Sequence, residues 1–180
     1  MKWNEARGIK GGICRILNDI AMIYLAQEEV AEAQNYFDQA LEIAEEIEDK
    51  FVMAAAIGNI GNIYVNSGEY ALAEEYIARA LQLNKEMGDQ QRIGQGMLQS
   101  AKVSILKRDN TQATLFVDQA ADIFVSIGVK NTTAYIMLYR GSIDLDQGNF
   151  NKAIQWCNKG LIISQEIASI ELQRDACDCP

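Results

Sequence analysis

Four cysteines and an excess of carboxylates are the residues of this chain that could do chemistry. Cys177 and Cys179 flank Asp178 at the end of the chain, and such a pair could hold a metal ion or act as a redox couple. Their spacing differs from the C-x-x-C of common zinc and thioredoxin-like motifs, and the chain contains no histidine to complete a metal site. We therefore expect no metal and no cofactor.

The absence of histidine also removes the commonest general base and the usual partner of a nucleophilic serine or cysteine. The chain contains no phosphate-binding loop GxxxxGK[ST], no dinucleotide fingerprint GxGxxG and no nucleophile elbow GxSxG. These observations together predict a protein that is not an enzyme.

The composition predicts a folded chain without a membrane span. Of the 180 residues, 49% are hydrophobic and 23% are charged, with a net charge of -9. This charge disfavours nucleic acid and anionic membranes as direct partners. No apolar run reaches the roughly 18 residues of a membrane helix, and no signal peptide opens the chain, so we expect a cytoplasmic location. The acidic run LEIAEEIEDK is either a solvated helix face or an acidic docking patch.

Helices must position these residues, because apolar side chains recur every three or four positions and the only proline is Pro180. The landmarks of the sequence also recur every 40 residues. Alanine stands at 33, 73, 113 and 153, and an aromatic residue stands at 36, 76, 116 and 156. This period predicts four helical hairpins, each with a short turn such as Ser67-Gly68-Glu69.

Two glycines inside an expected helix need separate explanations. Gly61 recurs as a small residue at 21, 101 and 141, which indicates a point where two helices cross closely. Gly58 does not recur, so either a ligand backbone approaches it or it has no special role.

The spacing of one set of residues resembles the tetratricopeptide repeat. This set consists of Ile57, Gly61, Tyr64, Gly68, Ala73, Ile77 and Ala80. The 40-residue period exceeds the usual 34, and it is similar to the longer repeats of kinesin light chains, LGN-type polarity adaptors and bacterial Rap-type regulators. Ser104, Arg108 and Asp144 depart from the repeat pattern.

The resemblance implies an all-α fold, a right-handed α-solenoid of stacked antiparallel hairpins. We expect one array over residues 1–180, with repeats at about 13–49, 53–89, 93–129 and 133–169. Residues 170–180 would begin a fifth repeat, and IKGG before Cys14 matches the junctions that precede the later repeats. Both ends therefore suggest a segment of a longer protein.

The resemblance also implies where a partner would bind, because the first helices of such repeats line a concave groove. Ladders of groove positions follow from the 40-residue shift. The candidate peptide-binding residues are Arg15, Asn18, Asp19, Met22, Asn59, Asn62, Asn66, Gln95, Gln99, Lys102, Tyr135, Tyr139 and Ser142. Most carry amides, which donate and accept hydrogen bonds and could hold a peptide by its backbone. Tyr135 and Tyr139 could anchor a ligand or pack against a further repeat.

Three functional hypotheses follow. The first is a scaffold that binds a peptide or protein segment in the groove. The second is a regulatory segment of a larger bacterial signalling protein that carries a nucleotide cyclase, a histidine kinase or a transcription regulator. The third is self-association through the exposed ends of the array, where apolar helix faces would lie open.

Overall fold

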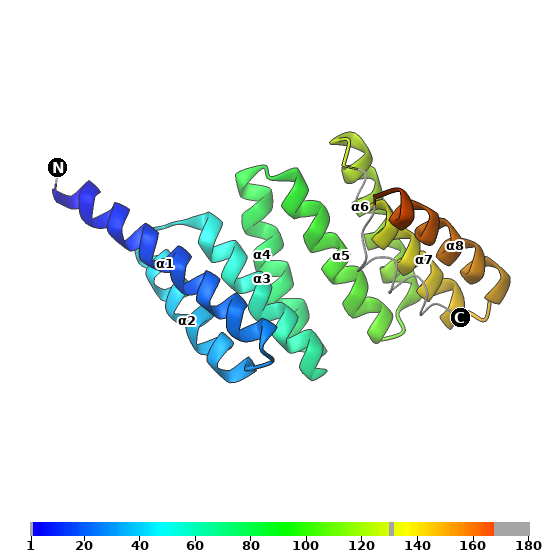
Figure 1. The fold of residues 1–180 in the computed structure, drawn as a ribbon, viewed down its shortest axis with the longest axis horizontal. Helices are drawn as coiled ribbons and strands as arrows, with labels where there is room; N and C mark the ends of the chain where they lie inside the picture. Colours follow the sequence, from blue (N-terminus) through cyan, green and yellow to red (C-terminus); the bar gives the residue numbers. More distant parts are fainter. Residues whose placement is uncertain (1, 130–131, 168–180) are drawn as a thin grey trace. The chain divides into compact units, whose positions relative to one another are not determined.

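The computed structural model describes residues 2–129 and 132–167, and the surroundings of the side chains of residues 8–129 and 132–166. Within this part of the chain all regular structure is helical (Figure 1). The eight helices are α1 Lys2–Ala26, α2 Val30–Glu46, α3 Lys50–Ser67, α4 Tyr70–Met87, α5 Gln90–Leu106, α6 Asn110–Ser126, α7 Thr133–Asp146 and α8 Phe150–Ile167. The predicted fifth repeat at 170–180, with Cys177 and Cys179, lies outside the described residues.

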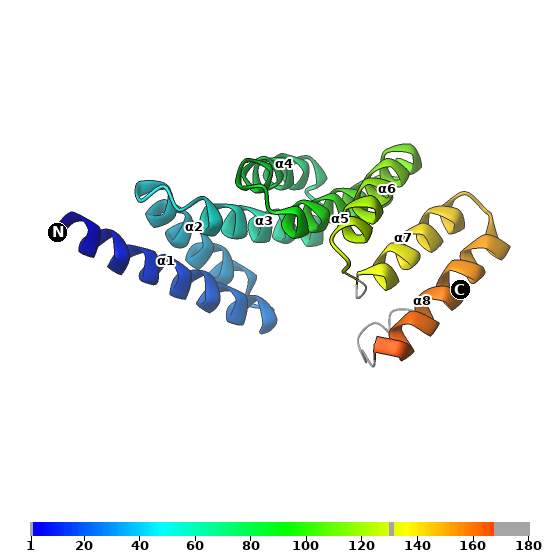
Figure 2. The same cartoon turned by 90° about the horizontal axis from the view of Figure 1, so that it is seen from above.

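Consecutive helices pair as antiparallel hairpins, as the 40-residue period predicts. The pairs are α1 with α2, α3 with α4, α5 with α6, and α7 with α8 (Figure 2). The chain divides into two compact units, residues 1–89 and residues 90–180. In unit 1 α2 packs on α3, and in unit 2 α6 packs on α7. The all-α repeat solenoid is confirmed, whereas one array through both units stays a prediction.

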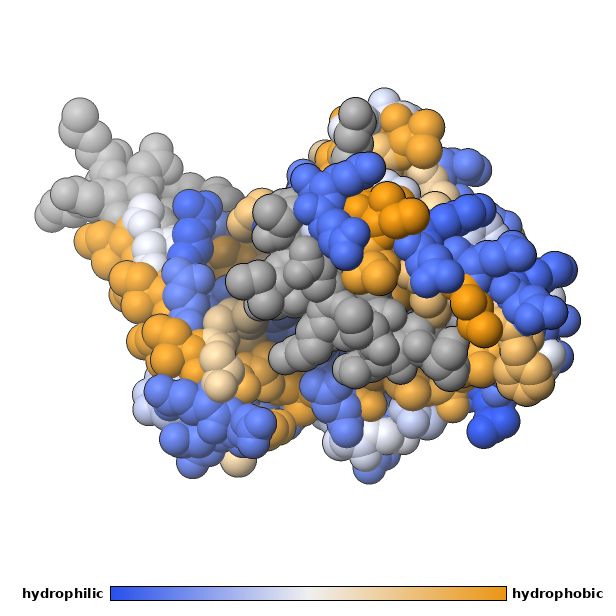
Figure 3. Space-filling view, turned by 45° about the vertical axis from the view of Figure 1, so that its right-hand side comes forward, coloured by the Kyte–Doolittle hydropathy of each residue, from blue (hydrophilic) through white to orange (hydrophobic). Residues whose placement is uncertain are grey.

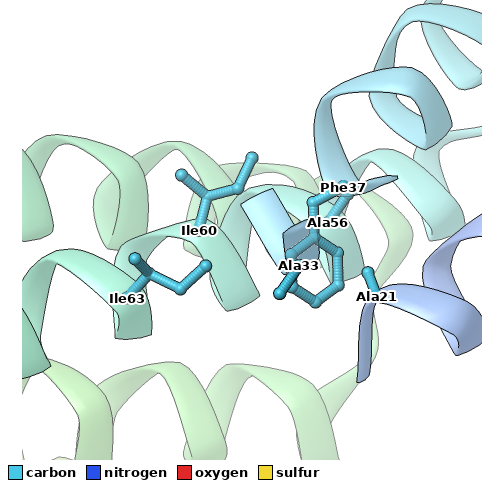
Figure 4. Packing of buried hydrophobic residues seen from close by; sticks show 6 residues of the cluster. All are labelled: Ala21, Ala33, Phe37, Ala56, Ile60 and Ile63. Atoms are coloured by element: carbon cyan, nitrogen blue, oxygen red, sulfur yellow. The ribbon is translucent and has the colours of Figure 1, made fainter. Parts of the chain in front are cut away.

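The core of unit 1 forms where the first helices meet α2. Ala21, Ala33, Phe37, Ala56, Ile60 and Ile63 form one buried cluster (Figure 4). Small residues at the crossing points let the large ones fill the space between helices. Gly61 serves this purpose, because an added Cβ would lie 3.0 Å from Ile77 Cγ1.

Each turn inside a hairpin contains one residue with left-handed backbone. Two of these residues are Gly68, with φ of 81°, and Gly148, with φ of 76°. Glu28 and Arg108 occupy the same register with φ of 64° and 60° although they are not glycines. The turn at Ser67-Gly68-Glu69 is therefore confirmed, and the departure at Arg108 leaves the backbone path unchanged.

One side-chain cap and a recurring ion pair stabilise the hairpins of unit 1. The Asp49 carboxylate accepts hydrogen bonds from the backbone N–H groups of Phe51 and Val52, both at 3.2 Å, and so caps α3. Lys50 Nζ donates to Glu86 Oε2 at 2.7 Å, and this bond lowers the pKa of the Glu86 carboxyl. Lys10 and Glu46 form the equivalent pair 40 residues earlier.

The structure contradicts one expected boundary. The junction expected at IKGG is absent, because α1 continues through Gly8, Gly11 and Gly12. Gly8 shares its register with Glu48, Gly88 and Gly128, which all have left-handed backbone. Glycine adopts either conformation, so the residue type alone does not decide between a helix and a junction here.

The structure also decides between the two explanations of Gly58. Gly58 is buried, and an added Cβ would lie 3.7 Å from the Cβ of Ala80 on α4, an ordinary contact distance. The glycine therefore faces its own hairpin rather than a ligand. No described helix combines the length and the apolar character that crossing a membrane requires.

Candidate protein-binding surface

The candidate residues of unit 1 lie on two neighbouring helices, α1 and α3, which contact each other. We call them the unit 1 face, and its members are Arg15, Asn18, Asp19, Met22, Asn59, Asn62 and Asn66. Asp19 and Asn66 are exposed, Met22 is 44% exposed, and Asn18, Asn59 and Asn62 are half-buried. The face therefore combines amides at several depths with one thioether.

Asn18 is the member of this face whose hydrogen bonding is incomplete. Its Oδ1 is buried, and it has no hydrogen-bond partner among the described residues. A buried acceptor without a donor costs about 1–3 kcal/mol. Asn18 has the register of Gly58, which faces its own hairpin, so this oxygen is not open to a ligand. The Arg15 guanidinium, by contrast, is already paired with the Asp49 carboxylate at 3.3 Å.

Charge is divided unevenly over unit 1. Residues 1–89 contain 16 acidic and 7 basic residues, a net of -9, which equals that of the whole chain. Within α1 only Glu5 and Asp19 are acidic, and α3 contains no acidic residue. The remaining carboxylates lie on α2, on α4 or in the connecting segments, and Glu42, Glu45 and Glu46 are exposed. The first helices carry five cations against two carboxylates, a net of +3, beside strongly acidic second helices, and the asparagines of the unit 1 face are uncharged.

The candidate residues of unit 2 lie on α5 and α7, which also contact each other. We call them the unit 2 face, and its members are Gln95, Gln99, Lys102, Tyr135, Tyr139 and Ser142. Gln95 and Lys102 are exposed, and the others are half-buried. Burial raises the pKa of the Tyr139 hydroxyl to about 12, and Tyr135 adds to this shift. The continuation of each ladder from one unit to the other stays a prediction.

Sequence reasoning missed a hydrogen bond that replaces an aromatic pair. Tyr24 stacks on Tyr36 with ring centroids 5.3 Å apart, and Tyr64 meets Tyr76 at 5.2 Å. In the last hairpin Trp156 Nε1 donates to Asp144 Oδ2 at 2.8 Å instead. Asp144 therefore departs from the repeat pattern for a structural reason. Tryptophan carries an indole N–H, which tyrosine lacks, and the carboxylate accepts a hydrogen bond from this group.

Two hollows were also missed. One of about 910 Å³ in unit 1 is lined by Gly8, Gly11 and Gly12 of α1 and by Arg15, Phe51 and Met87, among others. The other, of about 390 Å³ in unit 2, surrounds Arg140, whose guanidinium pairs with Asp118 at 2.8 Å and lies over the Trp156 ring. The close spacing of Gly8, Gly11 and Gly12 was the sequence feature that could have indicated the first hollow. The second depends on contacts between separate helices, which spacing does not show.

Metal-binding chemistry has no counterpart in the described part of the chain. No group of three or more cysteine, aspartate or glutamate side chains there is placed to hold a metal ion. Cys14 is buried against the backbone, with Sγ 3.3 Å from the carbonyl oxygen of Gly11. Burial raises the pKa of this thiol, which lowers its reactivity.

The fold defines a helical-repeat protein built of stacked helical hairpins. Residues 12–86 match the family model described as Tetratricopeptide repeat. The match identifies tetratricopeptide repeats in unit 1, which contains all of the matched residues. No curated protein matches it in sequence.

Solved structures share this helical-repeat fold. Aspartyl phosphate phosphatase F from Bacillus subtilis is similar, with a TM-score of 0.83 and 14% identity over 93% of this chain. The apo form of RapI gives 0.78 with 18% identity over 87% of the chain. BtubC from P. vanneervenii gives 0.74, also with 18% identity over 87% of the chain. This chain spans 44%, 57% and 65% of those three chains, so the likeness concerns part of each.

Proposed function

We propose that this chain is a non-catalytic interaction module, and that its first-helix faces bind an extended peptide segment of a partner protein. The observation that carries the proposal is the placement of amides on α1 and α3, away from the carboxylates of the second helices. A neutral amide face can satisfy peptide N–H and C=O groups without selecting a peptide charge.

Asn59 and Asn62 would form the contact region of unit 1. Asn59 and Asn62 lie one turn apart on α3, which suits an extended chain crossing the helix. On unit 2, Tyr135 and Tyr139 would supply apolar contact area for a ligand side chain.

The experiment is a selection from a displayed library of random peptides against three forms of the chain. The parent is compared with a face variant, Asn59→Ala with Asn62→Ala, and with a control variant, Asn35→Ala with Gln39→Ala. Asn35 and Gln39 are exposed on α2, so the control removes the same chemistry from the second-helix surface. Helicity and melting temperature of all three forms are compared first.

Peptides selected on the parent should bind the control equally and the face variant at least about tenfold more weakly, since two hydrogen bonds of about 1 kcal/mol each are lost. Equal binding to both variants would overturn the proposal. Failure to select any peptide would overturn it as well.

A regulatory role is the second candidate. It is favoured by the likeness to bacterial proteins longer than this chain, one of which is named a phosphatase. We expect the chain to carry the interaction and another domain to carry any output. Reading the gene on both sides of the present sequence tests this, because a fused cyclase, kinase or DNA-binding domain would support it and an isolated repeat array would not.

A further inference from the structure

The hollow of about 390 Å³ in unit 2 lies at a place that side chains fill in unit 1. A shift of 80 residues, which is two repeats, places Val117 in register with Phe37. The same shift places Arg140 in register with Ile60. In unit 1 the Phe37 ring is fully buried, and Ile60 is 1% exposed in the same cluster. Valine is smaller than phenylalanine, and the Arg140 guanidinium is held at Asp118. The hollow therefore has the position of a missing aromatic ring.

The hollow has an apolar floor and a polar rim. Val117 is fully buried and Ile143 is 6% exposed, so these two lining residues form the floor. The exposed lining residues form the rim, and they are Thr114, Asp118 and Gln147. Figure 3 likewise shows apolar patches among hydrophilic side chains on the side of the molecule where unit 2 lies. A ligand that enters here must combine an apolar tip with polar flanks.

Arg140 and Trp156 form a wall of the hollow that is fixed by hydrogen bonds. The Arg140 Cζ lies 5.3 Å from the centroid of the Trp156 ring, and Nη2 donates to Asp118 Oδ1 at 2.8 Å. Trp156 Nε1 donates to Asp144 Oδ2 at 2.8 Å. Lys159 Nζ also lies over the indole, 4.4 Å from its centroid. Two cations and two carboxylates thus compensate each other at this wall, so a neutral ligand is favoured over a charged one.

We infer that this hollow is a second binding site, and that it takes a phenylalanine side chain of a partner protein. A cavity of roughly 150 Å³ already holds a benzene ring, so the larger hollow accepts a ring together with part of the backbone that carries it. The ring would hold the position that Phe37 holds in unit 1 and would stack beside the Arg140 guanidinium. Phenylalanine fits better than tyrosine, because Val117 and Ile143 offer a phenol hydroxyl no hydrogen bond. The peptide groups of the ligand would meet the polar side chains of the rim.

The test uses N-acetyl-phenylalaninamide as the probe and the indole N–H signal of Trp156 as the reporter. The chain contains two tryptophans, and the variant Trp3→Phe identifies which signal belongs to Trp156. Addition of the probe to the ¹⁵N-labelled chain should shift this signal saturably, with a dissociation constant on the order of 1–10 mM for a ligand of this size. N-acetyl-alaninamide, which has the same amides and no ring, should leave the signal unchanged.

The variant Val117→Phe fills the hollow with the residue that unit 1 has at this register. It should stay folded and bind the probe about tenfold more weakly or less, because the place of the ring is taken. The control Val125→Phe adds the same ring to an 81% exposed position of α6 and should bind like the parent. Equal binding to Val117→Phe and the parent would overturn the inference. So would a Trp156 signal that does not move with about 20 mM probe, or that moves equally with N-acetyl-alaninamide.

A second variant keeps the test decisive if Val117→Phe unfolds. Arg140→Lys retains the charge and removes the planar guanidinium, so it should weaken probe binding about threefold. Unchanged affinity in this variant would contradict the site. The chain with Asn59→Ala and Asn62→Ala should bind the probe as the parent does, because neither residue lines the hollow. This inference therefore stands or fails separately from the proposed function.

Discussion

At the scale of single residues, Gly94 and Phe124 of the third hairpin compensate each other in size. The position of Gly94 on α5 faces that of Phe124 on α6, where an added Cβ on Gly94 would lie 2.7 Å from Phe124 Cζ. The equivalent pairs are Cys14 with Ala44, Ala54 with Asn84, and Ala134 with Ser164. Glycine therefore occurs where the facing side chain is largest, and Gly94 makes room for a buried ring.

The first prediction compares two buried glycines. Gly94→Ala should lower the free energy of unfolding by about 1–3 kcal/mol, because the new methyl group displaces the Phe124 ring. Gly58→Ala should instead leave stability unchanged or raise it by up to about 1 kcal/mol, because the methyl fits and the helix is favoured. Urea unfolding of both variants measures the difference. A Gly94→Ala chain as stable as the parent would contradict the described packing.

The second prediction concerns Tyr139 and alkaline pH. Its pKa in the folded chain is about 12, above the unfolded value of about 10. The folded state therefore holds the proton more tightly, and its stability advantage is present below pH 10 and lost as pH rises toward 12. Between pH 9 and 11 the parent should lose more stability than Tyr139→Phe. Parallel pH profiles for the two proteins would show that Tyr139 is not buried as described.

At the scale of elements, a left-handed residue ends each first helix, and only some of these residues are glycines. Glu28 adopts φ of 64° with a side chain, whereas Gly68 adopts 81° in the next hairpin. Left-handed backbone costs a non-glycine residue about 1–2 kcal/mol. The first hairpin therefore holds strain that the second does not.

The third prediction follows from this strain. Glu28→Gly should raise the free energy of unfolding by up to about 1 kcal/mol, since glycine adopts the left-handed region readily. The neighbouring change Gln27→Gly serves as control, because Gln27 does not have positive φ and should gain nothing. Thermal unfolding followed by circular dichroism measures both. Equal effects of the two changes would contradict the assigned turn.

Much of the arrangement of helices and turns was predictable from the sequence. The 40-residue period, the alanine positions and Gly68 predicted the hairpins and their turns, because these features are local and recur. The continuation of α1 through Gly8 was not predictable, since glycine fits both a helix and a junction. The bond between Trp156 and Asp144 depends on a contact between two helices, so Asp144 looked only like a departure from the pattern.

At the scale of the whole molecule, the two units differ in charge although they share one repeat. The net charge of -9 belongs to residues 1–89, and residues 90–180 contain nine acidic and nine basic residues. The unit 1 face nevertheless carries amides, and the unit 2 face adds two tyrosines. The sequence predicted which helices carry these residues. It does not identify a partner, so the nature of the ligand stays a proposal.

The measurement that tests the central claim most directly is the affinity of one selected peptide, determined by calorimetry with and without single backbone N-methyl groups. N-methylation at the positions that contact Asn59 and Asn62 should weaken binding about fivefold or more, because each removes one hydrogen-bond donor. The same modification should have little further effect on the Asn59→Ala, Asn62→Ala chain. Unchanged affinity after N-methylation throughout the peptide would contradict recognition of the peptide backbone by this face.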